Sequence, residues 1–261
     1  RIDANLKMID FLEKNSKSLY VREVSVLVYG DSKWFQENNY EEICSLLRAL
    51  LDVPQSDYEP ADAILERFHI ITSEQEILLK GRWKLHWKNF SMDSSQLRGG
   101  IAISSADIPF IARIEIDTDK VMTVENKTAF QRMDEATFSY LYLGGYANRH
   151  QLAFLKKVIE DNPELKYAHF GDIDAGGFLI HQNLCQATGK QFDLHCMGIS
   201  ELENEKFAIA RKTLTSNDVR RLHTLLEKEE YRHTIEYMLA NNCKMEQEIV
   251  SLFFCRRYQY V

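Results

Sequence analysis

The sequence has few cysteines and no long apolar run. No stretch of eighteen consecutive apolar residues occurs, so a transmembrane helix is not expected. The five cysteines are odd in number and scattered, and no two have the spacing Cys-x-x-Cys. This argues against both a disulfide framework and a zinc site. No signal peptide is visible either. These features together predict a cytoplasmic protein.

The chain also has fewer basic than acidic residues. The formal net charge is −7 at pH 7, which argues against a protein that wraps nucleic acid by bulk electrostatic attraction. An enzyme acting on nucleic acid remains compatible with this charge, because clustered acids at a metal site lower the total and local basic patches supply phosphate contacts. The 261 residues, 45% hydrophobic and 27% charged, are typical of a folded protein with one large or two small domains.

The first half of the chain predicts a mixture of helices and strands. Hydrophobic periodicity predicts helices over 5–14 and 40–51, and strands over 21–29 and 67–71. Residues 78–90 alternate basic and apolar side chains, which predicts a half-buried strand or hairpin with a basic outer face. Lys84 in this stretch is a candidate contact to a nucleic acid backbone. The pattern favours the alternative, a solvated edge strand protected by lysines.

The second half predicts strands that alternate with helices, the pattern of a mainly parallel sheet covered by helices. The expected strands cover 120–124, 138–143, 166–170 and 191–197, and the expected helices follow Asn148 and cover 178–187, 219–230 and 245–254. The fold class is therefore α/β. A turn-rich connection over 98–109 places the boundary between a smaller α+β domain, 1–108, and a second domain, 109–261.

Two aspartates follow the apolar strand over 166–170. In an extended backbone residues i and i+2 project from the same face, so Asp172 and Asp174 are expected side by side. Close carboxylates repel each other unless a cation lies between them, and oxygen ligands suit Mg²⁺ or Mn²⁺. Gly176 and Gly177 leave room for whatever approaches the metal. The alternative is a strand-to-helix turn in which one aspartate only caps the next helix.

Glu125 ends the strand over 120–124 as Asp172 ends its own strand. If these strands are neighbours, three carboxylates meet at one edge of the sheet. A divalent ion held there would polarise a phosphate oxygen and activate water. Glu125 would be a ligand or a general base with a raised pKa. The alternative for Glu125 is an exposed acid at the start of a helix, where the helix dipole favours it.

A glutamate after one strand, glycines after a second and Asp-x-Asp-x-x-Gly after a third resemble the Toprim domain, which topoisomerases, primases and several nucleases share. The detailed sequence resembles one branch, the JetD family, the nuclease subunits of Wadjet anti-plasmid systems. The motifs that carry the resemblance are Arg22-Glu23-Val24-Ser25, Gly30-Asp31-Ser32-Lys33, Ile77-Leu78-Leu79-Lys80-Gly81, Val124-Glu125-Asn126-Lys127-Thr128, Leu143-Gly144-Gly145-Tyr146, Gly171-Asp172-Ile173-Asp174-Ala175-Gly176-Gly177-Phe178 and Glu246-Gln247-Glu248.

This resemblance implies a winged-helix-like domain followed by a Toprim domain, as in the A subunit of topoisomerase VI. It implies a magnesium-dependent DNA endonuclease that acts on closed circular plasmid DNA beside an SMC-like ATPase complex, and a homodimer. Glu125, Asp172 and Asp174 become the catalytic acids that bind Mg²⁺ or Mn²⁺. The chain starts at Arg1 instead of a methionine, which predicts a fragment without the amino-terminal arm of the family.

Other charged residues are secondary candidates. Glu246 and Glu248 do not share a helix face, so at most one points inward, and Glu248 is the predicted further metal ligand. Lys127, Arg220 and Arg221 are candidate contacts to DNA phosphates, with solvated surface charge as the alternative for each.

Three rival functions remain. A topoisomerase-like strand transferase requires a tyrosine set after an arginine motif, and this chain has only Tyr20-Val21-Arg22, in the opposite order. That departure favours hydrolysis by metal-activated water. A non-catalytic, Toprim-shaped DNA-binding or assembly module is the second rival. A phosphatase of the haloacid dehalogenase type also uses Asp-x-Asp, but it needs threonine or valine where this chain has Gly176.

Overall fold

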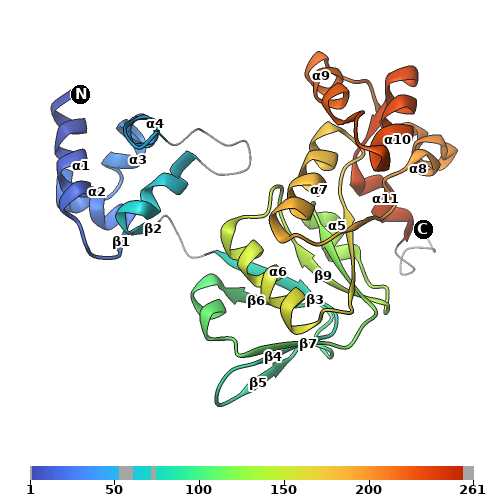
Figure 1. The fold of residues 1–261 in the computed structure, drawn as a ribbon, viewed down its shortest axis with the longest axis horizontal. Helices are drawn as coiled ribbons and strands as arrows, with labels where there is room; N and C mark the ends of the chain where they lie inside the picture. The colour runs from blue at the N-terminus through green and yellow to red at the C-terminus, as the bar shows by residue number, and fades with distance from the viewer. Residues whose placement is uncertain (1, 53–60, 72–74, 255–261) are drawn as a thin grey trace. The chain divides into compact units, whose positions relative to one another are not determined.

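The computed structural model describes residues 2–52, 61–71 and 75–254 and divides the chain into two compact units, 1–75 and 76–261 (Figure 1). The predicted boundary near residue 108 falls inside the second unit. The reason is that β6 (Ile101–Ser104) pairs antiparallel with β3 (Glu76–Lys80), so this turn-rich stretch contributes a strand to the main sheet.

The first unit is mainly helical over its described residues. Its elements are α1 (Ile2–Lys14), β1 (Leu19–Tyr20), α2 (Val21–Tyr29), α3 (Trp34–Asn38), α4 (Tyr40–Leu50), the 3₁₀ helix η1 (Ala61–Phe68) and β2 (Ile70–Ile71). The predicted helices over 5–14 and 40–51 are confirmed as α1 and α4. The predicted strand over 67–71 shortens to β2, which pairs in parallel with β1. The winged-helix assignment of this unit stays a prediction.

The predicted strand over 21–29 is wrong, because these residues form the helix α2. At its start, the Glu23 carboxylate accepts a hydrogen bond from the Tyr20 backbone N–H at 2.8 Å. At its end, Gly30 takes the left-handed conformation, with φ of 79°. Val21 and Val24 lie three residues apart and are both buried. Packing of one helical face thus outweighs the β propensity of a valine-rich segment.

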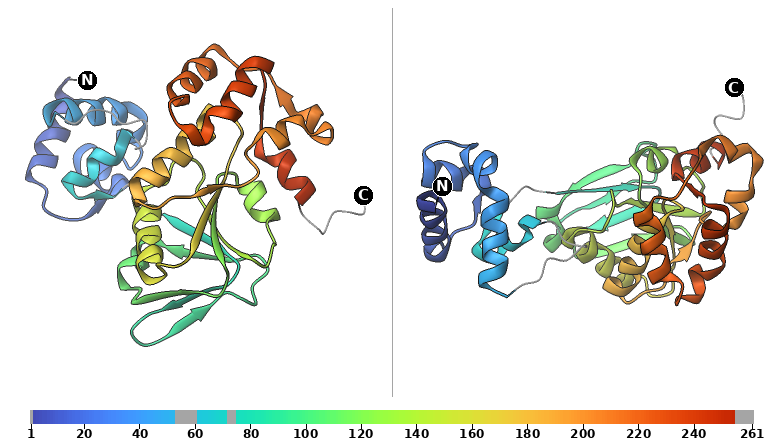
Figure 2. Two further views of the ribbon diagram at one scale, coloured as in Figure 1. Left: turned by 45° about the vertical axis from the view of Figure 1, so that its right-hand side comes forward. Right: turned by 90° about the horizontal axis from the view of Figure 1, so that it is seen from above.

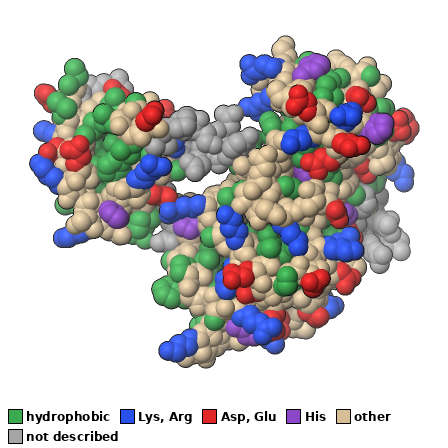
Figure 3. Space-filling model, viewed as in Figure 1, with side chains coloured by type: hydrophobic (Ala, Val, Ile, Leu, Met, Phe, Trp, Pro, Cys, Tyr) green, Lys and Arg blue, Asp and Glu red, His purple; other side chains and the backbone are tan. Residues whose placement is uncertain are grey.

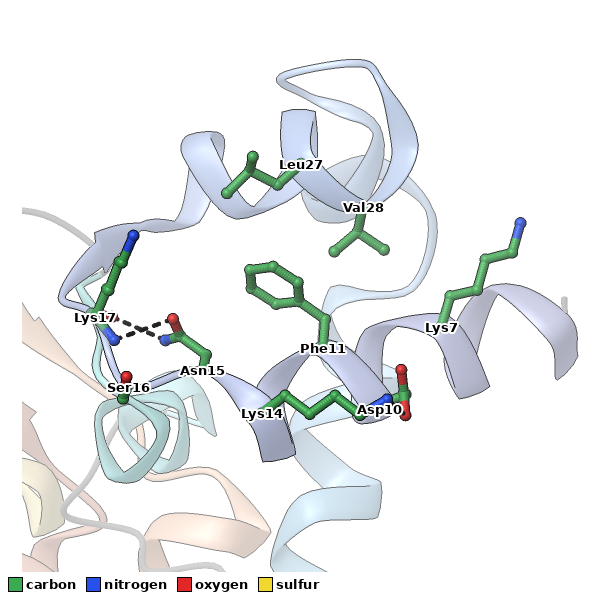
Figure 4. Close-up of a pocket in the computed structure, with 9 residues that line it drawn as sticks. All are labelled: Lys7, Asp10, Phe11, Lys14, Asn15, Ser16, Lys17, Leu27 and Val28. Carbon is green, nitrogen blue, oxygen red and sulfur yellow. Dashed lines mark hydrogen bonds and ion pairs between the residues drawn. The ribbon is translucent and has the colours of Figure 1, made fainter.

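A groove of the first unit runs between α1 and α2 (Figure 4). It is lined by Lys7, Asp10, Phe11, Lys14, Asn15, Ser16, Lys17, Leu27 and Val28. Three lysines surround its apolar floor, and one of them, Lys14, forms an ion pair with Asp10 at 2.5 Å. The groove is therefore a local concentration of positive charge in a chain with a negative total.

The second unit is built on a six-stranded sheet with the order β11-β10-β8-β9-β3-β6. The strands β8 (Lys120–Val124), β9 (Phe138–Tyr142), β10 (Lys166–Phe170) and β11 (Asp193–Leu194) are parallel to their neighbours in this group, while β3 joins β9 antiparallel. The α/β class is confirmed. The predicted mainly parallel sheet holds for these four strands, and the other two make it a mixed sheet.

Side chains of alternate strand residues enter different cores on the two faces of this sheet. On β8, Val121 packs into one core, whereas Met122 and Val124 pack into the other. The first core is covered by α6 (Arg149–Asp161) and by the small antiparallel sheet of β5 (Ser91–Asp93), β4 (Trp83–His86) and β7 (Arg113–Ile116) (Figure 2). The second core is covered by α5 (Lys127–Arg132), α9 (Ser216–Leu225), α10 (Glu229–Asn241) and α11 (Gln247–Phe254).

Several predicted elements of this unit change in extent. The stretch over 78–90 contains the end of β3 and all of β4. These strands belong to different sheets, so they do not form a hairpin, and the chain turns between them at Gly81, with φ of 103°. The predicted strand over 191–197 shortens to β11, and the predicted helix over 219–230 divides into α9 and α10. Among the described residues, no helix combines the length and apolar character that crossing a bilayer requires.

Candidate metal-binding site

The carboxyl ends of β8 and β10 lie next to each other, as the sequence predicted. The two strands pair in parallel with Val124 opposite Phe170. Glu125 continues this ladder by one residue, because its backbone N–H donates to the Phe170 carbonyl at 3.0 Å and its carbonyl accepts from the Gly144 N–H at 3.0 Å. The backbone of Glu125 is therefore fixed between two neighbouring strands at the rim of the sheet.

The side chain of Glu125 turns toward the segment after β10. Its Oε2 accepts a hydrogen bond from the Asp172 backbone N–H at 3.2 Å. A Cβ atom on Gly171 would lie 2.7 Å from this oxygen and 2.8 Å from Nε2 of His169, which is fully buried and contacts Thr123. Only glycine at this position lets the Glu125 carboxylate approach the strand end so closely.

Asp174 has an extended backbone and caps α7 (Ala175–Thr188). Ile173 between the two aspartates exchanges backbone hydrogen bonds with Met245 at 2.9 and 3.1 Å. Oδ1 of Asp174 accepts from the Gly177 N–H at 2.9 Å, so α7 begins three residues before its predicted start. The capping role considered as an alternative is thus present in Asp174, together with its place beside the other acids.

Burial and mutual repulsion perturb the acids at this rim. Burial, followed by the charges of Asp172, Asp174 and Glu248, raises the pKa of Glu125 to about 7. Burial, followed by neighbouring carboxylates, raises the pKa of Asp172 to about 6, although the Gln247 N–H that donates to it acts in the opposite direction. A bound cation would stabilise the charged form of carboxyl groups that resist ionisation near neutral pH, so such groups are candidates for a functional site.

The last helix, α11, adds a fourth carboxylate. Glu248 accepts a hydrogen bond from Nδ2 of Asn126 through its Oε1, while its Oε2 is buried and accepts no hydrogen bond from any described residue. Glu246 instead lies at the surface in an ion pair with Lys212. The two glutamates therefore point apart, and Glu248 is the one turned toward Glu125 and Asp172.

These acids do not form an assembled coordination shell. Within the described residues, no three His, Cys, Asp or Glu side chains are placed so that they could hold a metal ion as they stand. Their chemistry nevertheless fits a hard divalent cation, because every donor is a carboxylate oxygen and because burial, followed by mutual repulsion, raises the pKa values of Glu125 and Asp172. The unpartnered Oε2 of Glu248 points to the same kind of ligand.

The predicted phosphate contacts are dispersed. Lys127 is exposed on the first turn of α5, directly after the Asn126 cap. Arg220 and Arg221 lie on α9, and Arg220 donates to Asn217 at 2.7 Å. Lys84 is exposed on β4, in the small antiparallel sheet. On the face drawn in Figure 3, Lys and Arg side chains alternate with Asp and Glu, so that face carries no continuous positive field.

Three residues near the acids were not singled out from the sequence. Lys244 forms an ion pair with Asp218 at 2.8 Å, which is the main reason that its pKa is raised, and its charge also interacts with Asp174 and Asp172. Asn126 and Gln247 make the hydrogen bonds that join α11 to the strand ends. In the motif Glu246-Gln247-Glu248 only the two glutamates were considered as metal ligands, so Gln247 was missed.

The pH dependence of stability provides one prediction about Glu125. Glu125→Gln is expected to raise the Tm of metal-free protein at pH 8 and to change it little at pH 5. The folded pKa is about 7 and the ordinary value is 4.5, so folding takes up a proton and stability falls as the pH rises through this window. Glutamine does not ionise, so the variant avoids this loss of stability. Thermal unfolding of both proteins in EDTA at the two pH values measures the difference in Tm.

The control for this experiment is Glu246→Gln, which removes an exposed carboxylate at the residue before α11. It is expected to shift Tm little at either pH, because exposed ion pairs contribute roughly 0–1 kcal/mol. An equal shift at pH 5 and pH 8 in Glu125→Gln would contradict the perturbed titration of Glu125.

Comparison with known protein families identifies a match over most of the second unit. The family model described as "Wadjet protein JetD, C-terminal" matches residues 82–257. The matched range contains all four carboxylates of the rim and most of the second unit. No curated protein matches the chain.

Proposed function

This chain belongs to the JetD family of Wadjet proteins, and from that premise we propose that it is a divalent-metal-dependent DNA endonuclease of a Wadjet system. The observation that carries the proposal is the rim at the ends of the parallel strands, where burial and mutual repulsion act on four carboxylates from three segments of the chain. They leave one buried oxygen, Oε2 of Glu248, without a hydrogen bond from the described residues. Only a cation would turn this repulsion into attraction.

In this proposal Glu125, Asp172, Asp174 and Glu248 hold one or two Mg²⁺ or Mn²⁺ ions. The metal supplies charge stabilisation to the phosphodiester and an activated water. The protein fixes Glu125 through the backbones of two strands and Asp172 through the N–H of Gln247. The second unit then corresponds to a Toprim-like domain that hydrolyses DNA without a covalent protein intermediate.

In this proposal two lysines contact the DNA phosphates. Lys244 interacts electrostatically with Asp172 and Asp174, and Lys127 opens the helix that follows Glu125. A lysine beside a metal site contributes a point charge to a phosphate without a demand for fixed geometry. The remaining parts of the proposal are closed circular plasmid DNA as substrate, the ATPase complex of the same system as partner, and a homodimer that cuts both strands.

The test of this function is cleavage of supercoiled plasmid in Mg²⁺ or Mn²⁺, compared with EDTA and with Asp174→Asn. Asparagine keeps the helix cap of α7 and removes the charge. Cleavage is expected with metal, to disappear in EDTA, and to fall by about a hundredfold in the variant, since loss of one electrostatic group at a reacting phosphate has effects of this order. Equal cleavage by both proteins would contradict the assignment.

The same experiment separates the rival functions. A covalent protein–DNA adduct after denaturation would indicate strand transfer by a tyrosine. Metal-independent DNA binding without any cleavage, alone and together with the other subunits of the system, would indicate an assembly module.

A further inference from the structure

We infer that Gln247 is the positioning residue of the acid site, the group that holds the ends of β8 and β10 and the Asp172 carboxylate in one arrangement. This inference rests on the proposed function, because it concerns the metal that the acids would bind. Gln247 is uncharged and would not itself be a ligand of the metal.

Gln247 makes three hydrogen bonds to the rim. Its Nε2 donates to the Phe170 carbonyl at 2.8 Å, and its Oε1 accepts from the Asn126 backbone N–H at 2.8 Å. Its backbone N–H donates to Oδ1 of Asp172 at 2.7 Å. The amide therefore closes the ladder between β8 and β10 immediately after the last strand residues, and the backbone of the same residue orients an acid.

The environment of Gln247 makes these bonds strong and specific. The residue is fully buried, and both polar atoms of its amide are satisfied. Removal of the amide would leave the Asn126 N–H without its acceptor, which costs roughly 1–3 kcal/mol when such a group is unpaired, and would leave the Phe170 carbonyl with the Glu125 N–H as its remaining donor. These two backbone groups adjoin Glu125 and the segment that carries Asp172, so their displacement would move the acids.

Asn126 connects this arrangement to Glu248. Its backbone N–H is held by Gln247, its Nδ2 donates to Oε1 of Glu248, and its Oδ1 accepts from the Thr128 N–H at 2.9 Å at the start of α5. α5 and α11 lie side by side (Figure 1). Gln247 thus governs the position of Asp172 directly, and it governs those of Glu125 and Glu248 through Asn126.

Anchoring of α11 alone does not require this residue. Val250 on the same helix is fully buried in the apolar core and holds the helix against the sheet. A purely structural glutamine would lower stability when replaced without changing affinity for a metal. Metal affinity therefore distinguishes positioning from packing.

The chain contains a matched control in Gln151. This residue is also buried, with 3% of its surface exposed, and its Nε2 donates to the carbonyls of Tyr142 and Leu143 at 2.9 and 3.0 Å. Its Oε1 accepts from the Asn148 N–H at 2.9 Å. It performs the same type of backbone closure at the end of β9, and it contacts none of the four acids.

The experiment compares Gln247→Met and Gln151→Met with the wild-type chain. Methionine preserves the length and volume of the side chain and removes its hydrogen bonds, two in Gln247 and three in Gln151. The Kd for Mn²⁺ is measured by calorimetry or electron paramagnetic resonance at pH 7.5, and Tm is measured in EDTA. Asp172→Asn identifies the part of the Mn²⁺ signal that belongs to the acid site.

Both methionine variants are expected to lower Tm. Only Gln247→Met is expected to weaken Mn²⁺ binding at the acid site by tenfold or more, the usual effect of losing a group that orients metal ligands, which is about 10–100-fold. Gln151→Met is expected to stay within twofold of the wild type. If Gln247→Met does not fold, Gln247→Asn, which keeps an amide but is too short for both strand ends, is expected to weaken binding in the same direction.

Two results would overturn the inference. Wild-type binding that Asp172→Asn abolishes and Gln247→Met leaves unchanged would remove Gln247 from the site while the proposed function stands. Absence of Mn²⁺ binding in the wild-type chain, with no metal-dependent cleavage, would contradict both the role of Gln247 and the proposed function.

Discussion

Asp172→Asn is expected to reduce metal-dependent DNA cleavage by about a thousandfold and to make the metal-free protein more stable at pH 8. The first effect follows from loss of a ligand, because a bound metal contributes several kcal/mol of charge stabilisation and each 1.36 kcal/mol is a factor of about ten in rate. The second follows from the pKa of Asp172, which burial and the neighbouring acids raise to about 6 from the ordinary value of 3.8.

The sign of the stability effect is fixed by this shift. A carboxyl group whose folded pKa is raised stabilises the fold while it is protonated and loses that contribution as the pH rises from about 4 to about 6. At pH 8 the folded protein carries the full cost of the buried charge. Asparagine removes the charge and keeps Oδ1 as the acceptor for the Gln247 N–H. A gain of about 1 kcal/mol would raise Tm by about 2–4 °C.

Asp218→Asn is the control of opposite sign. Asp218 is also buried, but its ion pair with Lys244 at 2.8 Å and its hydrogen bonds to Thr215 hold its pKa below the ordinary value. Its replacement is expected to lower Tm at pH 8. Cleavage by Asp172→Asn within tenfold of the wild type, or a lower Tm than the wild type in EDTA, would contradict the view that this site trades stability for metal binding.

The sequence predicted the position of the acids better than the contacts that hold them. Glu125 and Asp172 were expected at one edge on the condition that their strands are neighbours, because parallel strands end on the same side, and β8 and β10 do pair in parallel. Helical spacing predicted that at most one of Glu246 and Glu248 points inward, and Glu248 was the choice; in the structure Glu246 precedes α11 and the two side chains have different partners. Both inferences use short-range periodicity, which is visible in the sequence.

The contacts that were not predicted join residues far apart in the sequence or involve the ends of helices and strands. Gln247 meets Asn126 across 121 positions of the chain, and no local pattern marks a glutamine whose two partners are backbone groups. The helix α2 was read as a strand because its valines favour β structure, while its stability comes from packing and from the Glu23 and Gly30 ends. Where tertiary contacts determine the secondary structure of a segment, its intrinsic propensity can predict the wrong element.

Gly177→Ala is expected to damage both the fold and the site, and it tests how closely α7 must approach the aspartates. A Cβ atom at this position would lie 2.1 Å from the Asp172 carbonyl oxygen, and 3.0 and 3.1 Å from its carbonyl carbon and backbone nitrogen. These are backbone atoms, so no side-chain rotation relieves the clash. The first turn of α7 would have to withdraw, and its Gly177 N–H would leave Asp174.

The expected loss of stability is about 3 kcal/mol, the upper part of the usual range for an overpacked core. A loss of this size corresponds to a fall in Tm on the order of 6–12 °C. Cleavage is expected to fall at least a hundredfold in the protein that remains folded, because Asp172 and Asp174 both move relative to Glu125 and a displaced catalytic group costs about that factor.

Gly176→Ala is the neighbouring control. A Cβ atom there would meet the side chain of Asp174, with Oδ1 nearest at 3.1 Å, and a side chain can shift by a few tenths of an ångström where a backbone cannot. Its Tm is expected to stay within a few degrees of the wild type, helped by the better helix propensity of alanine. If Gly177→Ala matched Gly176→Ala in both Tm and cleavage, α7 could not be packed against Asp172 as the structure has it, and the aspartates would lose the support on which a shared metal site depends.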